Sequence, residues 1–104
     1  MKSEIDIARA AQVHAEGALF VDVREVQEYR EGHVPGATNL PMSRLMTRLD
    51  ELDRTRPVHV ICASGGRSSA MADVMRAAGI DAVDVLGGTI AWARAGHPLE
   101  TGQG

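Results

Sequence analysis

The residues best suited to chemistry lie in one short segment around the single cysteine, Cys62. Residues 58–69 read VHVICASGGRSS, so an apolar strand leads to the cysteine and a glycine-rich turn follows it. Glycine readily adopts positive φ and lets the backbone fold around a small centre. Inward-facing amides, together with the N-terminus of a helix that opens after the turn, would favour the thiolate. The residues predicted to form this anion-binding loop are Ala63, Ser64, Gly65, Gly66, Arg67 and Ser68.

The alternative interpretation of Cys62 is an inert core thiol beside a plain turn, because cysteine is often buried. The combination of a strand, a cysteine, two glycines, an arginine and a helix start favours a functional loop. The same cradle would hold a persulfide, whose outer sulfur is also anionic near neutral pH. We therefore expect Cys62 to act as a nucleophile.

Short apolar segments alternate with helical patterns along the chain, and these elements must position the loop. Strands are expected at residues 18–23, 37–40, 57–61 and 82–86, with a short edge strand and a first helix within 5–16. Helices are expected at 25–31, across 42–52, from the loop to Gly79, and after Gly87-Gly88. Strands separated by helices indicate a parallel sheet that is covered on both faces. In such a fold, sites form at the carboxyl ends of strands, where Cys62 stands.

The segment 42–52 is expected to form a helix with one apolar face. The residues at helical spacing on that face are Met42, Leu45, Met46, Leu49 and Leu52. We interpret these methionines as core residues rather than as a metal site.

Length and composition limit the class of protein. The chain has 104 residues, of which 44% are hydrophobic and 24% charged, as in one globular domain. A net charge of -3 and only three aromatic residues argue against nucleic-acid binding. One cysteine excludes an intramolecular disulfide, and the four scattered histidines show no ligand spacing, so no metal is predicted. No apolar run is long enough for a membrane helix, and the start MKSEID is unlike a secretory signal, so a reducing cytoplasm is expected.

Four short motifs, taken in order, resemble those of the rhodanese family of sulfurtransferases. They are VDVRE at 21–25 with Glu28-Tyr29 after it, GHVPGA at 32–37, the loop 62–67, and LGG at 86–88 with Trp92 after it. The resemblance to a single-domain rhodanese covers nearly the whole chain. It implies a three-layer α/β fold with about five parallel strands and helices on both faces. The domain is expected to span residues 1–99, with residues 100–104 as a flexible tail.

The resemblance also implies an enzyme similar to thiosulfate sulfurtransferase, which works through a persulfide on Cys62 without a cofactor. Thiosulfate would donate the sulfane sulfur, and cyanide, a thiol or a protein would accept it. The loop amides would stabilise anionic sulfur, and Arg67 would attract the donor or fix the loop. Thiosulfate-preferring members often carry a basic residue just after the cysteine, whereas this chain has Ala63 and Ser64. A protein persulfide or another sulfane compound is therefore an alternative donor.

Two other functions are possible interpretations of this sequence: a phosphatase, and a persulfide carrier or interaction module. Phosphatases of the similarly folded cell-cycle type place five residues between the cysteine and the arginine, and only four stand between Cys62 and Arg67. That shorter loop disfavours phosphate. A persulfide carrier or interaction module that serves one partner protein is the second interpretation. Interaction modules of the family typically lack the cysteine, so the intact loop argues against a purely non-catalytic role.

Three polar residues outside the loop are predicted to support it: Asp22, Arg24 and His33. We interpret Asp22 and Arg24 as a structural ion pair that braces the first turn, with a pair lining the pocket as the alternative. We expect His33 to hydrogen-bond a carboxylate such as Asp22 or Glu28 and to pin its loop, with general acid catalysis as the alternative.

Three further side chains are interpreted as parts of the scaffold. His59 points to the side of its strand opposite to Cys62, because strand side chains alternate. Asp84 is expected to be structural within its strand. Trp92 is expected to pack in the core or to lie at the rim of the pocket.

Overall fold

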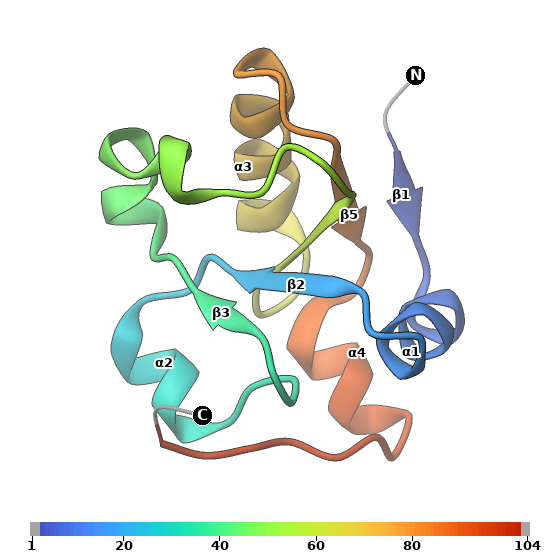
Figure 1. Ribbon diagram of the computed structural model, residues 1–104. Helices are drawn as coiled ribbons and strands as arrows, with labels where there is room; N and C mark the ends of the chain where they lie inside the picture. Colours follow the sequence, from blue (N-terminus) through green and yellow to red (C-terminus); the bar gives the residue numbers. More distant parts are fainter. Residues whose placement is uncertain (1–2, 103–104) are drawn as a thin grey trace.

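The computed structural model describes residues 3–102 and contains one five-stranded parallel sheet in the order β1-β5-β4-β2-β3 (Figure 1). The strands are β1 (Glu4–Ile5), β2 (Leu19–Asp22), β3 (Thr38–Asn39), β4 (Val58–Ile61) and β5 (Ala82–Val85). Strand β4 lies at the centre, and all of its residues are buried. A parallel sheet covered on both faces needs strands that are apolar throughout. The α/β fold class and the five parallel strands are therefore confirmed.

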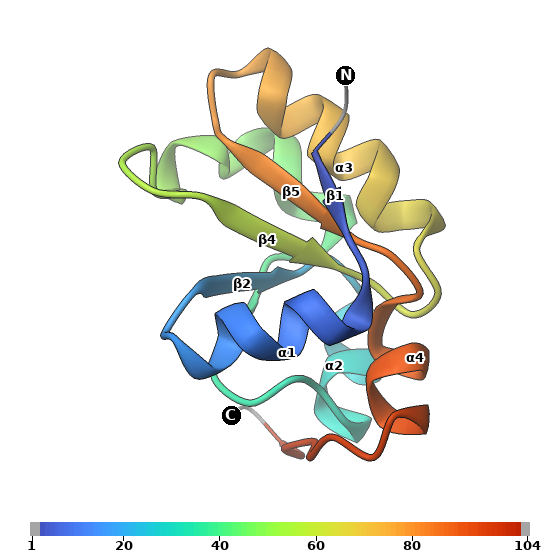
Figure 2. The ribbon, with the colours of Figure 1, turned by 90° about the vertical axis from the view of Figure 1, so that its right-hand side faces the viewer.

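Helices cover both faces of the sheet (Figure 2). They are α1 (Ile7–Ala15), α2 (Val26–Glu31), α3 (Gly66–Ala77) and α4 (Gly88–Arg94). Helix α3 shares one core cluster with Val60 and Cys62, whereas α1, α2 and α4 share the other with Ile61 and Trp92. This division follows the alternation of side chains along β4. Within residues 3–102, no helix combines the length and the apolar character that a membrane crossing requires.

The segment 42–52 differs from the expected amphipathic helix. It forms two short 3-10 helices, η1 (Met42–Thr47) and η2 (Leu49–Glu51). Leu45 is fully buried, but Met42 is 39% exposed and Met46 69%, so the expected apolar face and core position are wrong for these two methionines. A 3-10 helix has three residues per turn, and residues that would be neighbours on an α-helical face diverge around it.

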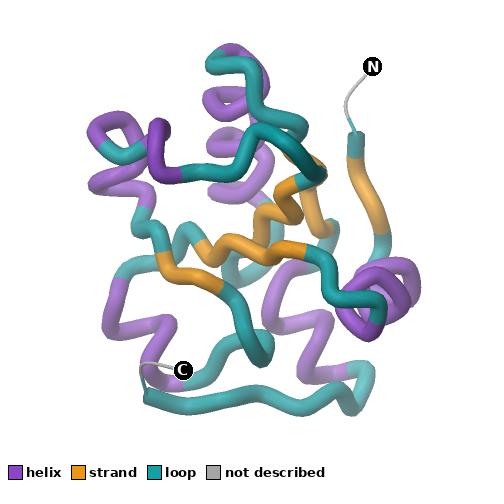
Figure 3. Tube along the Cα trace, in the orientation of Figure 1, coloured by secondary structure: helices purple, strands orange, loops and turns teal. Residues whose placement is uncertain are grey.

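Residues beyond 99, expected to form a flexible tail, make backbone hydrogen bonds to the domain. The chain after α4 runs back along the molecule to α2 (Figure 3). Glu100 pairs with His33 in an antiparallel bridge, each N–H donating to the other's carbonyl at 2.8 Å, and the N–H of Gly102 donates to the carbonyl of Arg30 at 2.8 Å. The expected tail is thus tied down as far as Gly102, while residues 103–104 lie outside the described residues.

The turn before α4 holds the end of β4 in place. Gly87 and Gly88 both have positive φ, of 82° and 62°. The amide of Thr89 donates to the carbonyl of Cys62 at 2.8 Å, and the amide of Ile90 donates to that of Ala63 at 3.0 Å. This contact needs a residue without a side chain, because a Cβ on Gly88 would lie 2.5 Å from both carbonyl oxygens.

We predict that Gly88→Ala lowers the free energy of unfolding by about 3 kcal/mol or more, because it adds a steric clash to an unfavourable φ. Gly36→Ala is the matched control: Gly36 has φ of 80°, but a Cβ there meets nothing within 4 Å. Only the strain of about 1 kcal/mol is expected for the control. Urea denaturation of both variants measures the difference, and equal losses would contradict the close approach.

Candidate active site

Cys62 directly follows β4 and is buried, with 1% of its surface exposed. The backbone N–H of Gly65 donates to Sγ at 3.1 Å. Gly65 has φ of 118°, which turns the loop sharply before α3 begins at Gly66. Among the described hydrogen bonds, Sγ accepts one from the amide of Gly65 and donates one to Oγ of Ser68, so one of the predicted amides lies at the sulfur.

The side chain of Ser68 connects the sulfur to a buried carboxylate. Sγ of Cys62 donates to Oγ of Ser68 at 3.4 Å, and this hydroxyl donates to Oδ1 of Asp84 at 2.6 Å. A serine hydroxyl has one proton, and the short bond to a carboxylate favours giving it to Asp84. Oγ of Ser68 also lies 3.1 Å from the carbonyl oxygen of Gly65. Ser68 therefore joins the cysteine loop to β5 through Asp84.

Asp84 thus has a partner in the loop that sequence reasoning missed. It lies on β5, next to β4 in the sheet, and is 3% exposed. The sequence signal was present, because a buried aspartate within an apolar strand needs a polar partner. Nothing in the sequence identified that partner as Ser68, which lies 16 residues away.

Arg67 forms a two-pronged ion pair with Glu28 of α2. Its Nη1 and Nη2 donate to the two carboxylate oxygens, each at 2.8 Å. The hydrogen bonds from Arg67 are the largest cause that lowers the pKa of Glu28 from 4.5 to about 2. Both side chains are about one-third exposed, so the pair lies at the surface. It ties the cysteine loop to α2 and neutralises the cation predicted to attract a donor.

Asp22 and Arg24 form a second ion pair at the end of β2. The guanidinium donates to the Asp22 carboxylate at 2.7 to 3.1 Å, and the backbone N–H of Arg24 donates to it at 3.0 Å. Nη2 of Arg24 also donates to the carbonyl of Gly32 at 2.7 Å. These bonds join the first turn to the end of α2, which is the geometry of a brace.

His33 is buried, and its partner differs from the one expected. Its Nδ1 lies 2.8 Å from the carbonyl of Tyr29, and its ring stacks on the Tyr29 ring at 3.7 Å between centroids. Within residues 3–102, Nε2 has no hydrogen-bond partner, and it lies 3.7 Å from the Glu100 carboxylate. The expected bond to Asp22 or Glu28 is wrong, because Arg24 and Arg67 already bind those carboxylates.

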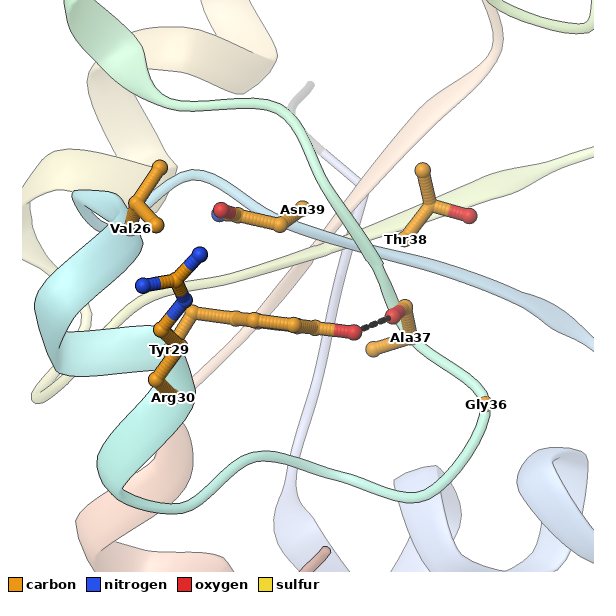
Figure 4. A pocket seen from close by; sticks show the side chains of 7 residues that line it. All are labelled: Val26, Tyr29, Arg30, Gly36, Ala37, Thr38 and Asn39. Carbon is orange, nitrogen blue, oxygen red and sulfur yellow. Dashed lines mark hydrogen bonds between the residues drawn. The ribbon is translucent and has the colours of Figure 1, made fainter. Parts of the chain in front are cut away.

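Two cavities lie near these residues. The larger, of about 540 Å³, lies between α2 and β3, and there the hydroxyl of Tyr29 donates to the carbonyl of Ala37 (Figure 4). The side chain of Asn39 donates to the carbonyls of Asp22 and Arg24. The smaller, of about 340 Å³, touches the cysteine loop at Ala63. Its other lining residues include Glu28, Glu31, Ile90 and Leu99. Cys62 does not line it, so the sulfur is closed off in this conformation.

Comparisons with known proteins agree with this geometry. Residues 7–95 match the family model described as Rhodanese-like domain. The chain belongs to this family. It is 36% identical to a sulfurtransferase of Allochromatium vinosum over 107 residues, which covers 100% of both chains. It is 35% identical to a putative sulfur carrier protein, YrkF, of Bacillus subtilis over 78 residues, which is 74% of this chain and 42% of that one.

A solved structure confirms the fold. The crystal structure of a rhodanese-related protein from Thermoplasma volcanium superposes with a TM-score of 0.88 at 32% identity, covering 95% of this chain and 97% of that one. Similarity extends over almost the whole of both molecules, so the likeness is that of one rhodanese-like domain to another.

We predict that Glu28→Gln lowers the free energy of unfolding by about 0.5 to 1 kcal/mol at neutral pH, since the lost pair is partly exposed. The folded-state pKa of Glu28 is lowered from 4.5 to about 2. The difference in unfolding free energy between wild type and Glu28→Gln is therefore largest above about pH 5 and disappears as the pH falls toward 2. Urea denaturation across this range measures it, with Glu31→Gln as the control. An advantage that does not change with pH would contradict the pairing.

Proposed function

We propose that this protein transfers sulfane sulfur through a persulfide on Cys62. The Cys62 thiolate attacks the outer sulfur of a donor such as thiosulfate, the bond between the two donor sulfurs breaks, and sulfite leaves with the electron pair. A thiophilic acceptor (cyanide, a thiol or a protein) then attacks the outer sulfur of the persulfide, and the Cys62 thiolate leaves. The observation that carries the proposal is the position of Sγ at the carboxyl end of β4, 3.1 Å from the amide of Gly65.

In this reaction the loop amides would stabilise the sulfur that is transferred. A persulfide extends beyond Sγ by one sulfur atom, whose negative charge develops during the attack. Amides of residues 63–68 around that outer sulfur would stabilise it electrostatically, as donors in an oxyanion hole do. The start of α3 at Gly66 adds the positive end of a helix dipole.

The buried sulfur means that the loop must open during turnover. Cys62 is 1% exposed, and the Glu28–Arg67 pair holds the loop against α2. We infer that breaking this pair accompanies access of the donor. An anionic donor would also compete with Glu28 for Arg67, which would weaken the attraction for a small anion such as thiosulfate.

A persulfide carrier for one partner protein is the second candidate. One relative bears the name of a putative sulfur carrier, and the cavity beside the loop combines apolar side chains with the acidic Glu28 and Glu31. Such a surface suits a protein acceptor better than a small anion. Slow turnover with cyanide, together with rapid transfer to a protein thiol, would select this candidate.

We predict that treatment with a sulfane donor adds the mass of one sulfur atom to the wild-type protein and none to Cys62→Ser. Mass spectrometry of the intact protein, followed by peptide mapping, measures the addition. Cyanide should remove the added sulfur from the wild-type protein as thiocyanate. Unmodified wild-type protein across thiosulfate, polysulfide and protein persulfide donors would rule out the proposal, as would equal loading of the serine variant.

We predict that Glu28→Gln increases the rate at which iodoacetamide alkylates Cys62 by about fivefold, because release of a pair worth about 1 kcal/mol makes loop opening easier. Iodoacetamide is uncharged, so Arg67 does not attract it. Glu31→Gln is the matched control, since Glu31 lines the same cavity on the same helix and removes the same charge. Equal acceleration in both variants would indicate a general charge effect instead of a released loop.

A further inference from the structure

A third cavity lies at the opposite end of β4 from Cys62. It has a volume of about 400 Å³ and is lined by residues of β1, α1 and the starts of β2, β4 and β5. In Figure 2 the starts of β2 and β4 lie on the same side of the molecule as the C-terminal end of α1. His59, near the start of β4, lines the cavity, whereas Cys62 follows the end of that strand. The cavity is therefore separate from the proposed sulfur-transfer site.

A buried histidine offers an unpartnered atom in this cavity. His59 is 7% exposed, and its ring stacks on Phe20 at 5.3 Å between centroids. Nδ1 lies 3.2 Å from the carbonyl of Leu19. A carbonyl only accepts, so Nδ1 carries the proton and a neutral ring keeps a lone pair on Nε2. Nε2 has no hydrogen-bond partner among residues 3–102.

Burial is the largest cause that lowers the pKa of His59, against an opposing effect from its bond to Leu19 and from Asp81. The ring is consequently neutral at physiological pH. Neutral His59 can accept a hydrogen bond through Nε2, so a ligand in this cavity needs a donor group to satisfy it.

Two arginines give the cavity a positive rim. Arg9 of α1 donates to the neutral side chain of Gln12 at 3.2 Å. Arg56, before β4, makes longer contacts of 3.5 Å with the Asp53 carboxylate and the carbonyl of Gly17. Glu16 is the acidic residue among those that line the cavity. The guanidinium of Arg9 makes no described contact with a carboxylate, and that of Arg56 makes only the 3.5 Å contact with Asp53, so N–H donors of both remain available to an anion.

The rest of the lining is apolar. Ile5, Val13, Leu19 and Val83 surround the polar groups. A ligand that fills this cavity must therefore match a cationic rim, the water-accessible acceptor nitrogen of His59 and an apolar wall at once.

We propose that this cavity binds a small amphipathic carboxylate that carries an N–H or O–H donor beside its carboxylate group. Arg9 and Arg56 hold the carboxylate, Nε2 of His59 accepts from the neighbouring donor, and the apolar part lies against Val13 and Leu19. N-acyl amino acids and the C-terminal residue of a peptide share this chemistry. The site is independent of sulfur transfer, because none of its residues belongs to the cysteine loop.

The test is an NMR titration of the whole protein with N-acetyl-leucine, which has a carboxylate, an adjacent N–H and an apolar side chain. We expect saturable shifts with a dissociation constant of about millimolar or below, confined to the lining residues and to the ring nitrogens of His59. N-acetyl-leucinamide lacks the charge and 4-methylpentanoate lacks the N–H, so both should bind more weakly. A peptide ending in leucine distinguishes the two sources, because only a site open to a chain would bind it as tightly.

Variants separate this site from general surface binding. Arg9→Gln and Arg56→Gln, both at exposed positions, should each weaken binding by roughly threefold to fivefold. Arg94→Gln is the control, since Arg94 lies on α4 outside the cavity. Cys62→Ser should bind normally, which keeps this result separate from the proposed function. Unsaturable or scattered shifts, equal binding of the amide or of 4-methylpentanoate, or equal weakening by Arg94→Gln would each overturn the proposal.

Discussion

The contact between the end of β4 and the start of α4 is the constraint on which the candidate active site depends. Thr89 donates to the carbonyl of Cys62 through both its amide and its hydroxyl, at 2.8 and 3.0 Å. These bonds satisfy the strand-end carbonyl, which would otherwise be buried without a partner. With that carbonyl fixed, the chain turns at Gly65 and brings its own amide back to the sulfur. Two glycine positions with positive φ, Gly65 and Gly88, therefore determine where the Cys62 sulfur lies.

The described conformation is closed, and its electrostatics are consistent with a resting state. The sulfur is buried, and the hydroxyl of Ser68 links it to Asp84. The arginine of the loop is occupied by Glu28. Neither arrangement leaves the sulfur or Arg67 open to an anion. Both can be reversed by small movements, because a hydroxyl rotates easily and a partly exposed ion pair contributes little to stability. Opening the loop therefore requires only a local rearrangement.

Local patterns in the sequence predicted the scaffold well, because apolar strands and glycine turns are encoded by neighbouring residues. The first helix and its edge strand, the helix that ends near Gly79 and the loop after Cys62 all follow from such patterns. Contacts between distant segments did not follow. Arg67 and Glu28 are 39 residues apart, and no spacing rule joins them. The bridge between His33 and Glu100 is not predictable for the same reason, because polar residues near a chain end look like a frayed tail in the sequence. Met46 was misplaced because apolar spacing alone does not separate an α-helix from a 3-10 helix.

Strand β4 carries different chemistry at its two ends, and the pairing of charges explains the contrast. At the carboxyl end, both nearby arginines form ion pairs, Arg24 with Asp22 and Arg67 with Glu28. At the amino end, Arg9 and Arg56 make only weak or long contacts. A free anion that approaches the molecule consequently meets more available positive charge beside His59 than beside Cys62. For the proposed sulfur transfer, this contrast disfavours small anionic donors and favours a donor or acceptor that binds through the apolar side chains of Ile90 and Leu99. Recognition by surface contact rather than by charge is the mode expected of a protein partner.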